Sequence, residues 1–592
     1  MRNHEFKKLN VEIMKIKYTI ATRFFLIISL VGALYSCSNF LDVPAEEVVA
    51  AKNMYRDKND ADAAVKGIYG KFMTLAEQYV VLNELRADLM DVTPNADYYL
   101  QQISSHNVSA DNPYADPTPF YELINECNDA LVNFTKMHNE LKLLTEPYNQ
   151  RYSDIGTLRS FLYLELVTQY GKVPYITKPM ESVESMKTLE ASAPMLDIPT
   201  MVDTLVNFME GLPTLDRYTD PDMRTSIDGY PMDVMFIDKK FFMGDLYLWQ
   251  NNYLAAASMY KSLMDMDISR ANSYDSYKIP RTFDPYNIDK YNSGYYRYYY
   301  WDVNSKLNHW PYMFSTRNQD ADFYTEWIWV MEFDKVYKPT NPFFKLFSKT
   351  QGDYMLKPSE SIVDLWNSQV QQNGFMGDFR GNTGSYKTGD DNSQPEITKY
   401  TSEFDPLDPF NKQGKFMLQR AALLHLRYSE AANRDGEHKI AYYLINQGMS
   451  SYNPIPDGVT DVSMYQRTLK PFPYDFDALS SAVYHQPSMY RGPWYRNAGI
   501  RGRVYLGSLP IPEGADSLQA IEHMLINEDA REMAFEGNRW GDLVRIALRE
   551  NDPSILADRV YEKLKKDNHP EADAVRQKLM NPDNWFLPLP AK

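Results

Sequence analysis

"GDLYLWQNNYLAAASMYKSLM", residues 244–264, predicts two antiparallel helices joined by a turn at residues 250–252. The small residues Gly244 and Ala256 would let the two helices approach closely. Tyr247 and Tyr260 would fill the remaining space between them. The stretch therefore predicts a helical hairpin whose contact combines small and aromatic residues.

These offsets match the small and aromatic positions of a tetratricopeptide repeat. A second candidate pair is "LLHLRYSEAANRDGEHKIAYYLINQ", residues 423–447, with small contacts at Ser429 and Ala441 and a turn at residues 435–436. We place the two pairs at about residues 238–266 and 415–448. Recurrence in one chain favours a repeated scaffold over chance.

Further helices are predicted outside these pairs. In "SDIGTLRSFLYLELVTQYGKVP", residues 153–174, Ser153 or Asp154 can cap the first turn, and Gly171 with Pro174 ends the helix. Its apolar residues fall on several faces, so we expect a helix packed on most sides. Residues 60–79 are another candidate helix. The predicted fold is mainly α, a superhelical scaffold of helix pairs in a single large body.

The N-terminal segment resembles an export signal. An apolar run from Phe24 to Tyr35 follows Lys15, Lys17 and Arg23, and twelve residues at about 1.5 Å each cannot cross a hydrocarbon layer of about 30 Å. We predict a signal peptide over residues 1–36, with Met14 a better candidate than Met1 for the true start.

Leu34, Tyr35 and Ser36 precede Cys37 in the manner of a bacterial lipobox. Cys37 is therefore the predicted lipid anchor and the first residue of the mature chain at 37–592. An ordinary secretory peptide with an incidental cysteine is the alternative. A lipidated Cys37 would leave Cys127, the second of two cysteines, without a disulfide partner.

Composition excludes one class of partner. The formal net charge is −17 and the pI about 5.1, so a nucleic-acid backbone would be repelled. The 592 residues are 44% hydrophobic, which is ample for a large core. The 45 tyrosines outnumber the 28 phenylalanines, and this balance suggests many rings at wet surfaces.

Two long irregular stretches lie between the predicted helices. Residues 271–320 are dense in tyrosine, and residues 373–411 are rich in Gly, Asp, Asn and Pro. Loops of this length are usually functional or disordered, and because a disordered tract would be poor in aromatics, we expect residues 271–320 to be ordered and to form part of a ligand-binding face. We place the loop-rich ligand-binding region at about residues 271–411.

No metal or cofactor is predicted. The nine histidines show no pair at ligand spacing. Asp378, Asp390 and Asp391 could hold calcium in an acidic loop, but their spacing fits no EF-hand.

Four separated blocks carry a family resemblance: "CSNFLD" from Cys37, "LRSFLYLELVTQYGKVP" at 158–174, "LLHLRYSEAAN" at 423–433 and "NEDAREMAFEGNRWGDLVR" at 527–545. The chain also closes with "NPDNWFLPLP" at 581–590. The sequence resembles the SusD-like (RagB/SusD) family of Bacteroidota outer-membrane nutrient-binding lipoproteins. Together the blocks span essentially the whole mature chain.

The fourth block is the most specific. Its matching positions are Glu528, Glu532, Glu536, Gly537, Arg539, Trp540, Asp542 and Arg545. Asp529 replaces an arginine of the family pattern, and Arg531 is the candidate substitute in the ion pair. Glu532 and Glu536, at i and i+4, could be read as a glycosidase carboxylate pair. We interpret them instead as part of an ion-paired helix wall, with Arg539, Asp542 and Arg545, around Trp540.

The resemblance implies a function. Members of the family are mostly α-helical, with tetratricopeptide-like pairs and irregular ligand-binding loops. They act as a lid on a SusC-like TonB-dependent transporter outside the outer membrane, bind oligosaccharides or peptides, and catalyse no reaction. This chain is accordingly expected to be a surface glycan-binding lipoprotein. A peptide cargo is the alternative, and an outer-membrane glycoside hydrolase is the least favoured reading.

By position in the family, two loops would form the ligand face. The first is "ELRADLMDVTPNADYYLQQ" at 84–102, and the second spans 291–312. A flat ring can cover the C–H face of a pyranose while polar side chains bind its hydroxyls. The predicted ligand residues are Arg86, Asp91, Asn95, Tyr98, Tyr99, Tyr295, Tyr296, Tyr298, Tyr299, Tyr300, Trp301 and Trp310. About half of these rings are expected to pack inward.

Overall fold

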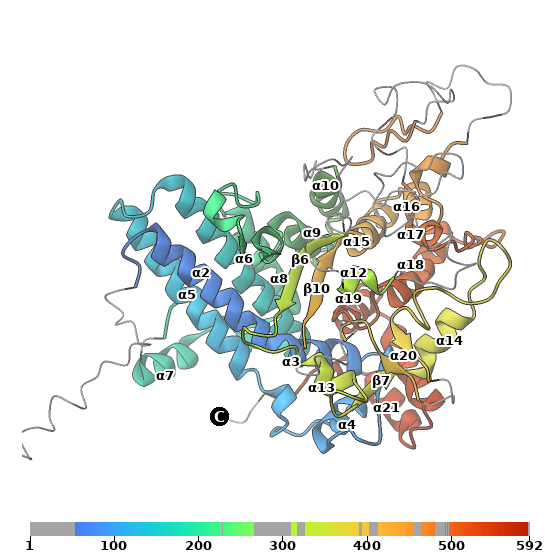
Figure 1. Cartoon of the computed structure of the whole chain (residues 1–592), viewed down its shortest axis with the longest axis horizontal. Coiled ribbons are helices and arrows are strands. Elements are labelled where there is room, and N and C mark those ends of the chain that lie inside the picture. Colours follow the sequence, from blue (N-terminus) through green and yellow to red (C-terminus); the bar gives the residue numbers. More distant parts are fainter. Residues whose placement is uncertain are drawn as a thin grey trace, which may run out of the picture. The chain divides into compact units, whose positions relative to one another are not determined.

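The structure is a computed structural model that describes residues 54–180, 182–227, 229–265, 310–315, 326–389, 394–401, 412–454, 456, 465–479, 492, 494 and 497–589. The chain divides into two units, Met1–Arg56 and Asp57–Lys592. In the second unit most described elements are helices, as the sequence predicts (Figure 1).

The helices are α2 (Lys58–Phe72), α3 (Ala76–Val80), α4 (Tyr98–Ser104), α5 (Thr118–Asn139), α6 (Thr145–Tyr170), α7 (Val183–Ser192), α8 (Ile198–Glu210), α9 (Lys239–Trp249), α10 (Tyr253–Met264), α12 (Tyr312–Ser315), α13 (Phe343–Phe347), α14 (Glu360–Asn367), α15 (Ala421–Arg434), α16 (His438–Ile445), α17 (Ile500–Arg503), α18 (Ser517–Met533), α19 (Arg539–Glu550), α20 (Ser554–Lys566) and α21 (Ala572–Leu579). None of the helices in the described residues is long and apolar enough to span a membrane.

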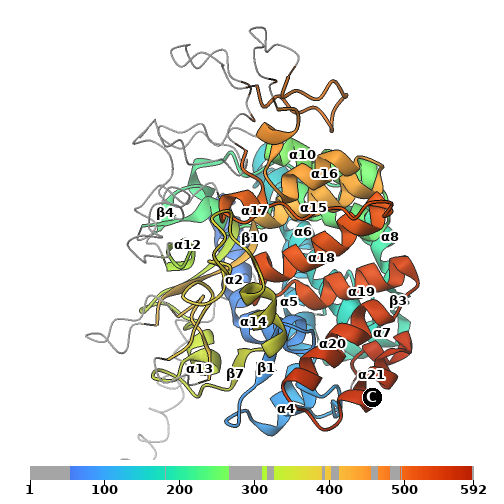
Figure 2. The ribbon, with the colours of Figure 1, turned by 90° about the vertical axis from the view of Figure 1, so that its right-hand side faces the viewer.

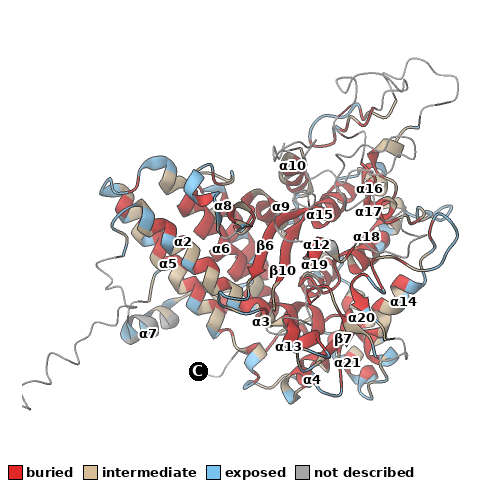
Figure 3. Ribbon diagram, in the orientation of Figure 1, coloured by how far each residue is buried: buried red, intermediate tan, exposed pale blue. Residues whose placement is uncertain are grey.

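The strands are short and pair in twos. They are β1 (Met90–Val92), β2 (Lys172–Pro174), β3 (Met195–Asp197), β4 (Ser226–Ile227), β5 (Tyr230–Pro231), β6 (Trp327–Phe333), β7 (Leu356–Pro358), β8 (Tyr386–Lys387), β9 (Glu396–Ile397) and β10 (Gly414–Arg420). β6 pairs with β10 in an antiparallel ribbon, and all residues of both strands are buried (Figure 3). Side chains on both faces of this ribbon therefore belong to the core.

Successive helices pack on one another along the chain. α5 packs on α6, α6 on α8, α8 on α9, α9 on α10, α10 on α15, and α15 on α16 and α18. Figure 2 shows the C-terminal helices α18 to α21 in a row, with α14 beside α18 and α20. The predicted mainly α scaffold of helix pairs is confirmed.

The hairpin of residues 244–264 is confirmed as α9 and α10. A Cβ built on Gly244 would lie 2.5 Å from the ring of Tyr260, so the ring occupies the space that glycine leaves. The Tyr260 hydroxyl donates to Asp245 Oδ1 at 2.6 Å, and Ala256 is fully buried. Gly244, Ala256 and Tyr260 thus lie in the contact between the two helices. The half-buried Tyr247 instead donates its hydroxyl hydrogen to Glu210 Oε1 of α8 at 2.8 Å.

The second pair is confirmed as α15 and α16, with Ser429 and Ala441 buried and the turn at Gly436 in a left-handed conformation. Its predicted start at residue 415 is wrong. Residues 414–420 form β10, and the helix begins only at Ala421. The apolar run in this stretch covers only residues 416–418, and a run this short cannot be assigned to a helix or a strand by apolar pattern alone.

The helix predicted from Ser153 begins earlier. α6 starts at Thr145, so Ser153 and Asp154 lie inside it, both fully buried, and neither is a cap. Pro147 looks like a helix breaker in sequence, but the first helical turn tolerates proline because its N–H groups lack intrahelical partners. The end at Gly171 is as expected, with a positive φ of 72°.

Glycine-to-alanine changes should separate the two kinds of helical glycine in this scaffold. Gly244→Ala places a methyl group against the Tyr260 ring, and we expect it to lower the free energy of unfolding by about 1–3 kcal/mol. Gly67→Ala, the same change at an open position of α2, should instead raise it by about 0.5–1 kcal/mol. Chemical denaturation of both variants measures the two effects. Equal effects of the same sign would contradict this packing of α9 on α10.

Candidate functional site

The motif at 527–545 spans the end of α18, a tight connection and the start of α19. α18 ends at Met533 and α19 begins at Arg539, so Glu536 lies outside both helices. The predicted i, i+4 relation of Glu532 and Glu536 on one helix is therefore wrong. Phe535 (φ 71°) and Gly537 (φ 80°) turn the chain, and their backbone N–H groups donate to the buried carboxylate of Glu84 at 3.0 and 2.7 Å.

Glu532 is the centre of a buried ion network. Its carboxylate accepts from Arg380 Nη1 at 2.7 Å and Arg420 Nη1 at 2.8 Å, and it also pairs with Arg503. Burial alone would raise the pKa of Glu532, but the guanidinium groups of Arg503, Arg420 and Arg380 lower it to about 2. The carboxylate is ionised and fully enclosed.

Glu536 belongs to the same network. It accepts from Arg420 Nε at 2.7 Å and pairs with Lys399, whose ammonium also donates to the Ala534 carbonyl at 2.9 Å. We call the side chains of Glu326, Arg380, Lys399, Arg420, Arg503, Glu532 and Glu536 the central ion network. Since Glu532 and Glu536 are buried and each holds cations, neither is open to a substrate, and the structural interpretation of this pair is favoured over the glycosidase one.

The other motif residues pair mainly with residues outside the motif, although the expected contact of Arg545 with Asp542 is present. Arg539 donates to Asp88 Oδ1 at 2.6 Å, and Arg545 donates to Glu430 Oε2 at 2.8 Å and Asp542 Oδ1 at 3.1 Å. Trp540 is fully buried, with the guanidinium of Arg86 4.0 Å from its ring centroid. The predicted wall of Glu532 and Glu536 with Arg539 and Arg545 is therefore replaced by separate clusters, because the chain turns at Phe535.

The substitute ion pair proposed from the sequence is present. Arg531 Nη2 donates to Glu528 Oε2 at 2.6 Å, and both side chains are buried in α18. Arg501 Nη1 reaches the same oxygen at 2.9 Å. Arg531 is thus ion-paired within α18, and its role as the substitute for the family arginine stays a prediction.

Trp310, a predicted ligand residue, is a core residue. Its side chain is fully buried, and its Nε1 donates to Ser385 Oγ at 3.1 Å. Lys399, Arg420 and Arg503 lie 5.6 to 5.8 Å from its ring centroid. The indole packs against the cations of the central ion network and is closed to solvent. The prediction that Trp310 belongs to the ligand face is therefore wrong.

Arg86 and Asp91, also predicted as ligand residues, are buried as well. Arg86 is 2% exposed and donates to Gln169 Oε1 and the Trp585 carbonyl. Asp91 is 5% exposed and accepts from Ser104 Oγ at 2.8 Å. Both polar groups are bound inside the protein, which a pattern of loop residues does not reveal.

Asn95, Tyr98 and Tyr99 remain accessible. Asn95 is exposed, and its Nδ2 donates to the Asp353 carbonyl at 3.1 Å. Tyr98 is 68% exposed at the start of α4, and the half-buried Tyr99 lies beside it with 5.7 Å between ring centroids. Asp97 caps the helix by accepting from Leu100 N at 2.8 Å, which fixes this pair of rings.

Several predicted sites lie outside the described residues: Cys37, Tyr295, Tyr296, Tyr298, Tyr299, Tyr300, Trp301, Asp390 and Asp391. Asp378, the third member of the candidate calcium group, is buried and accepts from Arg380 Nη2 at 2.6 Å. Its carboxylate is therefore already neutralised by a guanidinium. Within the described ranges, no group of three or more His, Cys, Asp or Glu side chains could hold a metal ion.

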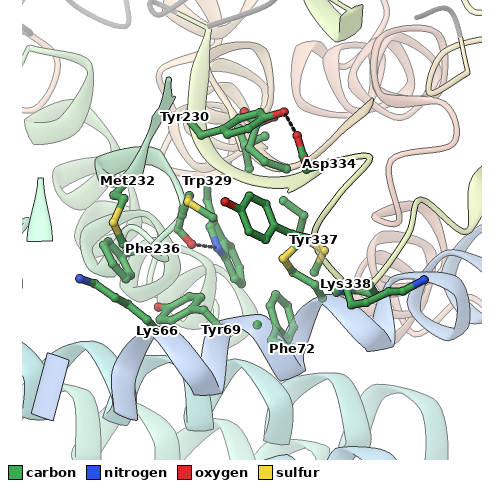
Figure 4. Close-up of a pocket in the computed structure, with 17 residues that line it drawn as sticks. Lys66, Tyr69, Phe72, Tyr230, Met232, Phe236, Trp329, Asp334, Tyr337 and Lys338 are labelled. Carbon is green, nitrogen blue, oxygen red and sulfur yellow. Dashed lines mark hydrogen bonds between the residues drawn. The ribbon is translucent and has the colours of Figure 1, made fainter. Parts of the chain in front are cut away.

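A cavity of about 220 Å³ lies between α2, the segment 230–236, β6 and the loop 334–339 (Figure 4). Its wall on α2 repeats at helical spacing through Lys66, Tyr69 and Gly70, and Met73 continues the wall directly after the helix. We call this cavity the α2–β6 pocket. The sequence predicts a helix over residues 60–79, but no pattern within it links this helix to the segment 230–236 or to β6.

Aromatic rings form much of the inner wall of the α2–β6 pocket. Trp329 stacks on Phe72 with ring centroids 5.3 Å apart and an interplanar angle of 12°. Tyr69 meets Phe236 edge-on at 5.1 Å. These contacts hold the rings in place, so the pocket is preformed.

At the mouth, Asp334 organises a polar group. Its Oδ2 accepts from the Tyr230 hydroxyl at 2.5 Å and from Gln413 Nε2 at 3.0 Å, and its Oδ1 accepts from Val336 N at 2.7 Å. Tyr337, 52% exposed, lies between Trp329 and Lys338 in Figure 4. The pocket thus has an apolar interior and a polar, solvent-accessible entrance.

No family model and no curated protein matches the sequence. Solved structures do match its fold. A SusD superfamily protein from Bacteroides vulgatus is 14% identical with a TM-score of 0.56, and the match covers 91% of this chain and 96% of that one. A SusD-like carbohydrate binding protein from Bacteroides fragilis is also 14% identical, with a TM-score of 0.54 and coverage of 90% and 97%.

A laminarin binding SusD-like protein is 14% identical with a TM-score of 0.51, again with coverage of 90% of this chain and 97% of that one. The chain described here has the fold of the SusD superfamily.

Proposed function

We propose that this chain is a SusD-like lipoprotein that binds an oligosaccharide or polysaccharide outside the outer membrane and delivers it to a SusC-like TonB-dependent transporter. The observation that carries the proposal is the shared fold over about nine-tenths of the chain with proteins described as carbohydrate binding and laminarin binding. The lipobox-like segment before Cys37 supports the anchor and the exterior location.

The proposed ligand face combines accessible rings with polar neighbours. Tyr98 and Tyr99 present two rings beside the exposed amide of Asn95. The tyrosine-rich segment with Tyr295, Tyr296, Tyr298, Tyr299, Tyr300 and Trp301 stays part of the proposal. Rings that stack on sugar C–H faces supply affinity, and neighbouring amides and carboxylates select among hydroxyl patterns.

Affinity electrophoresis and isothermal titration calorimetry against plant, host and microbial polysaccharides test the proposal. Binding of one glycan class supports it, and silence across the whole panel would count against it. Mass spectrometry of co-purified ligand distinguishes a glycan from the alternative peptide cargo. Assays for release of reducing ends test the hydrolase reading, which an inactive protein would exclude.

The anchor and the transporter have their own tests. Labelled palmitate should appear on the expressed protein and be absent from a Cys37→Ser variant. A SusC-like protein should co-purify from detergent-solubilised outer membranes. A freely soluble periplasmic product would contradict both parts.

Tyr98→Ala should weaken binding of the glycan that the panel identifies by about 1–3 kcal/mol, the range for stacking on an exposed aromatic ring. Its melting temperature should stay nearly unchanged, because the ring is 68% exposed. Phe472→Ala, at a 52% exposed ring that lies outside both the proposed face and the α2–β6 pocket, is the matched control. Equal affinity of the Tyr98→Ala variant and the unmodified protein would remove Tyr98 from the ligand face.

A further inference from the structure

The interior of the α2–β6 pocket offers a ligand almost nothing to hydrogen-bond. The Trp329 indole N–H donates to the Met235 carbonyl at 3.2 Å, and the Tyr69 hydroxyl accepts from Ile237 N at 3.1 Å. The remaining inner wall is made by side chains such as Phe72, Met73 and Met232. A sugar ring would leave its hydroxyls unpaired here, at a cost of about 1–3 kcal/mol for each buried group.

An apolar ring or chain fits this interior better. An apolar cavity of about 150 Å³ is large enough to bind benzene, and the α2–β6 pocket measures about 220 Å³. Methionine and aromatic side chains adapt to flat and branched apolar groups alike. The volume and the lining therefore favour an aromatic or aliphatic body.

Helix α2 leaves room on its side of the pocket. A Cβ built on Gly70, a lining residue, would meet no atom within 4 Å. Glycine inside a helix costs about 0.5–1 kcal/mol relative to alanine. At Gly70 the space that a side chain would take is left open at the pocket wall. At Gly244, in the contact of α9 with α10, the corresponding space is taken by the Tyr260 ring.

The charges at the mouth are unbalanced in favour of cations. Lys66 and Lys338 lie at opposite ends of the pocket in Figure 4, and neither pairs with a carboxylate among the residues that the structure describes. Asp334 already accepts three hydrogen bonds from neutral donors. Glu332, the other acidic lining residue, pairs with Lys415 at 3.0 Å. In a chain with a net charge of −17, two lysines without acidic partners flanking one cavity are complementary to an anionic group.

We propose that the α2–β6 pocket binds a small amphipathic organic anion, whose apolar ring or chain occupies the interior and whose carboxylate, sulfonate or phosphate group pairs with Lys66 or Lys338 at one end of the pocket. This site is separate from the proposed glycan face and does not depend on it. The ligand would enter past Tyr337, the exposed ring at the entrance.

Two fluorescent probes test the proposal. The anionic probe is 1-anilinonaphthalene-8-sulfonate, and the uncharged one is N-phenyl-1-naphthylamine. Both should bind the full-length purified protein at one site, with the stoichiometry checked by native mass spectrometry. Gly70→Leu should weaken both probes at least about tenfold, because the new side chain fills the apolar interior.

Gly67→Leu is the matched control, since it lies on the same helix, has open space around its Cβ and does not line the pocket. It should leave both probe affinities unchanged, and both leucine variants should keep the glycan binding of the unmodified protein. The double variant Lys66→Gln, Lys338→Gln should weaken the sulfonate probe about three- to tenfold and leave the uncharged probe unaffected, a difference set by charge pairing.

Three results would overturn the proposal. They are the absence of probe binding to the unmodified protein, equal probe affinity in Gly70→Leu and Gly67→Leu, and equal loss of both probes in the lysine variant. If the unmodified protein binds the probes but no glycan, that result would count against the proposed function instead.

Discussion

Replacing Arg420 with methionine is expected to lower the free energy of unfolding by about 3–5 kcal/mol, because it leaves buried carboxylates without their shared cation. The Arg420 guanidinium is fully buried and donates to Glu536, Glu326 and Glu532 at 2.7 to 2.8 Å. It also donates to the Glu532 carbonyl at 2.6 Å. Methionine keeps most of the volume, so the cost measures lost charge pairing rather than a cavity.

Arg576→Met is the matched control. Arg576 in α21 pairs with Asp558 at 2.7 Å, but its side chain is 40% exposed. Exposed pairs contribute about 0–1 kcal/mol, so this variant should unfold close to the unmodified protein. Chemical denaturation measures both. An Arg420→Met midpoint equal to that of Arg576→Met would mean that the central ion network does not stabilise the fold.

The central ion network also explains how the loop-rich middle of the chain is held. Arg380 and Lys399 come from the region predicted as a ligand face, yet both reach the C-terminal motif and are fully buried. Arg503, from α17, pairs with Glu532, and Arg420, from β10, pairs with both Glu532 and Glu536. Four segments distant in sequence thus meet at Glu532 and Glu536, which fixes the frame from which exposed loops can present ligand residues.

The helix pairs could be predicted from the sequence because their contacts are local. Gly244 and Tyr260 are sixteen positions apart, and the same spacing rules set both the helices and their contact. The strand β10 could not be distinguished from a helix, since its pairing partner β6 lies about 90 residues earlier. The hydrophobic pattern of a short stretch of sequence carries no information about a pairing partner so far away in the chain.

The candidate site was harder to predict because burial is a tertiary property. Tyr98 and Trp310 both occur in aromatic loop sequences, yet one is 68% exposed and the other 0%. Arg86 resembles a ligand-binding arginine but lies against Trp540. The turn at Phe535 separated Glu536 from α18, and the only sequence signal for it was Gly537 with Asn538 before the next helix.

Trp310→Ala is expected to lower the free energy of unfolding by about 3–5 kcal/mol, the usual cost of removing a large buried aromatic side chain. The indole is fully buried, donates to Ser385 and lies over three cations of the central ion network. Removing it would open a cavity beside charged groups and admit water to them. Trp310→Phe keeps an aromatic face over these cations and should cost less.

The measurement pairs denaturation with calorimetric binding of the identified glycan, and Tyr98→Ala is the comparison. The two variants should show opposite patterns, because one ring stabilises the core and the other faces solvent. We expect Trp310→Ala to lose stability and, under conditions where it remains folded, to keep its glycan affinity within about threefold. If Trp310→Ala instead keeps the unfolding midpoint of the unmodified protein and loses its glycan affinity, Trp310 belongs to the ligand face. Such a result would mean that the ring contributes to ligand binding and not to the stability of the core.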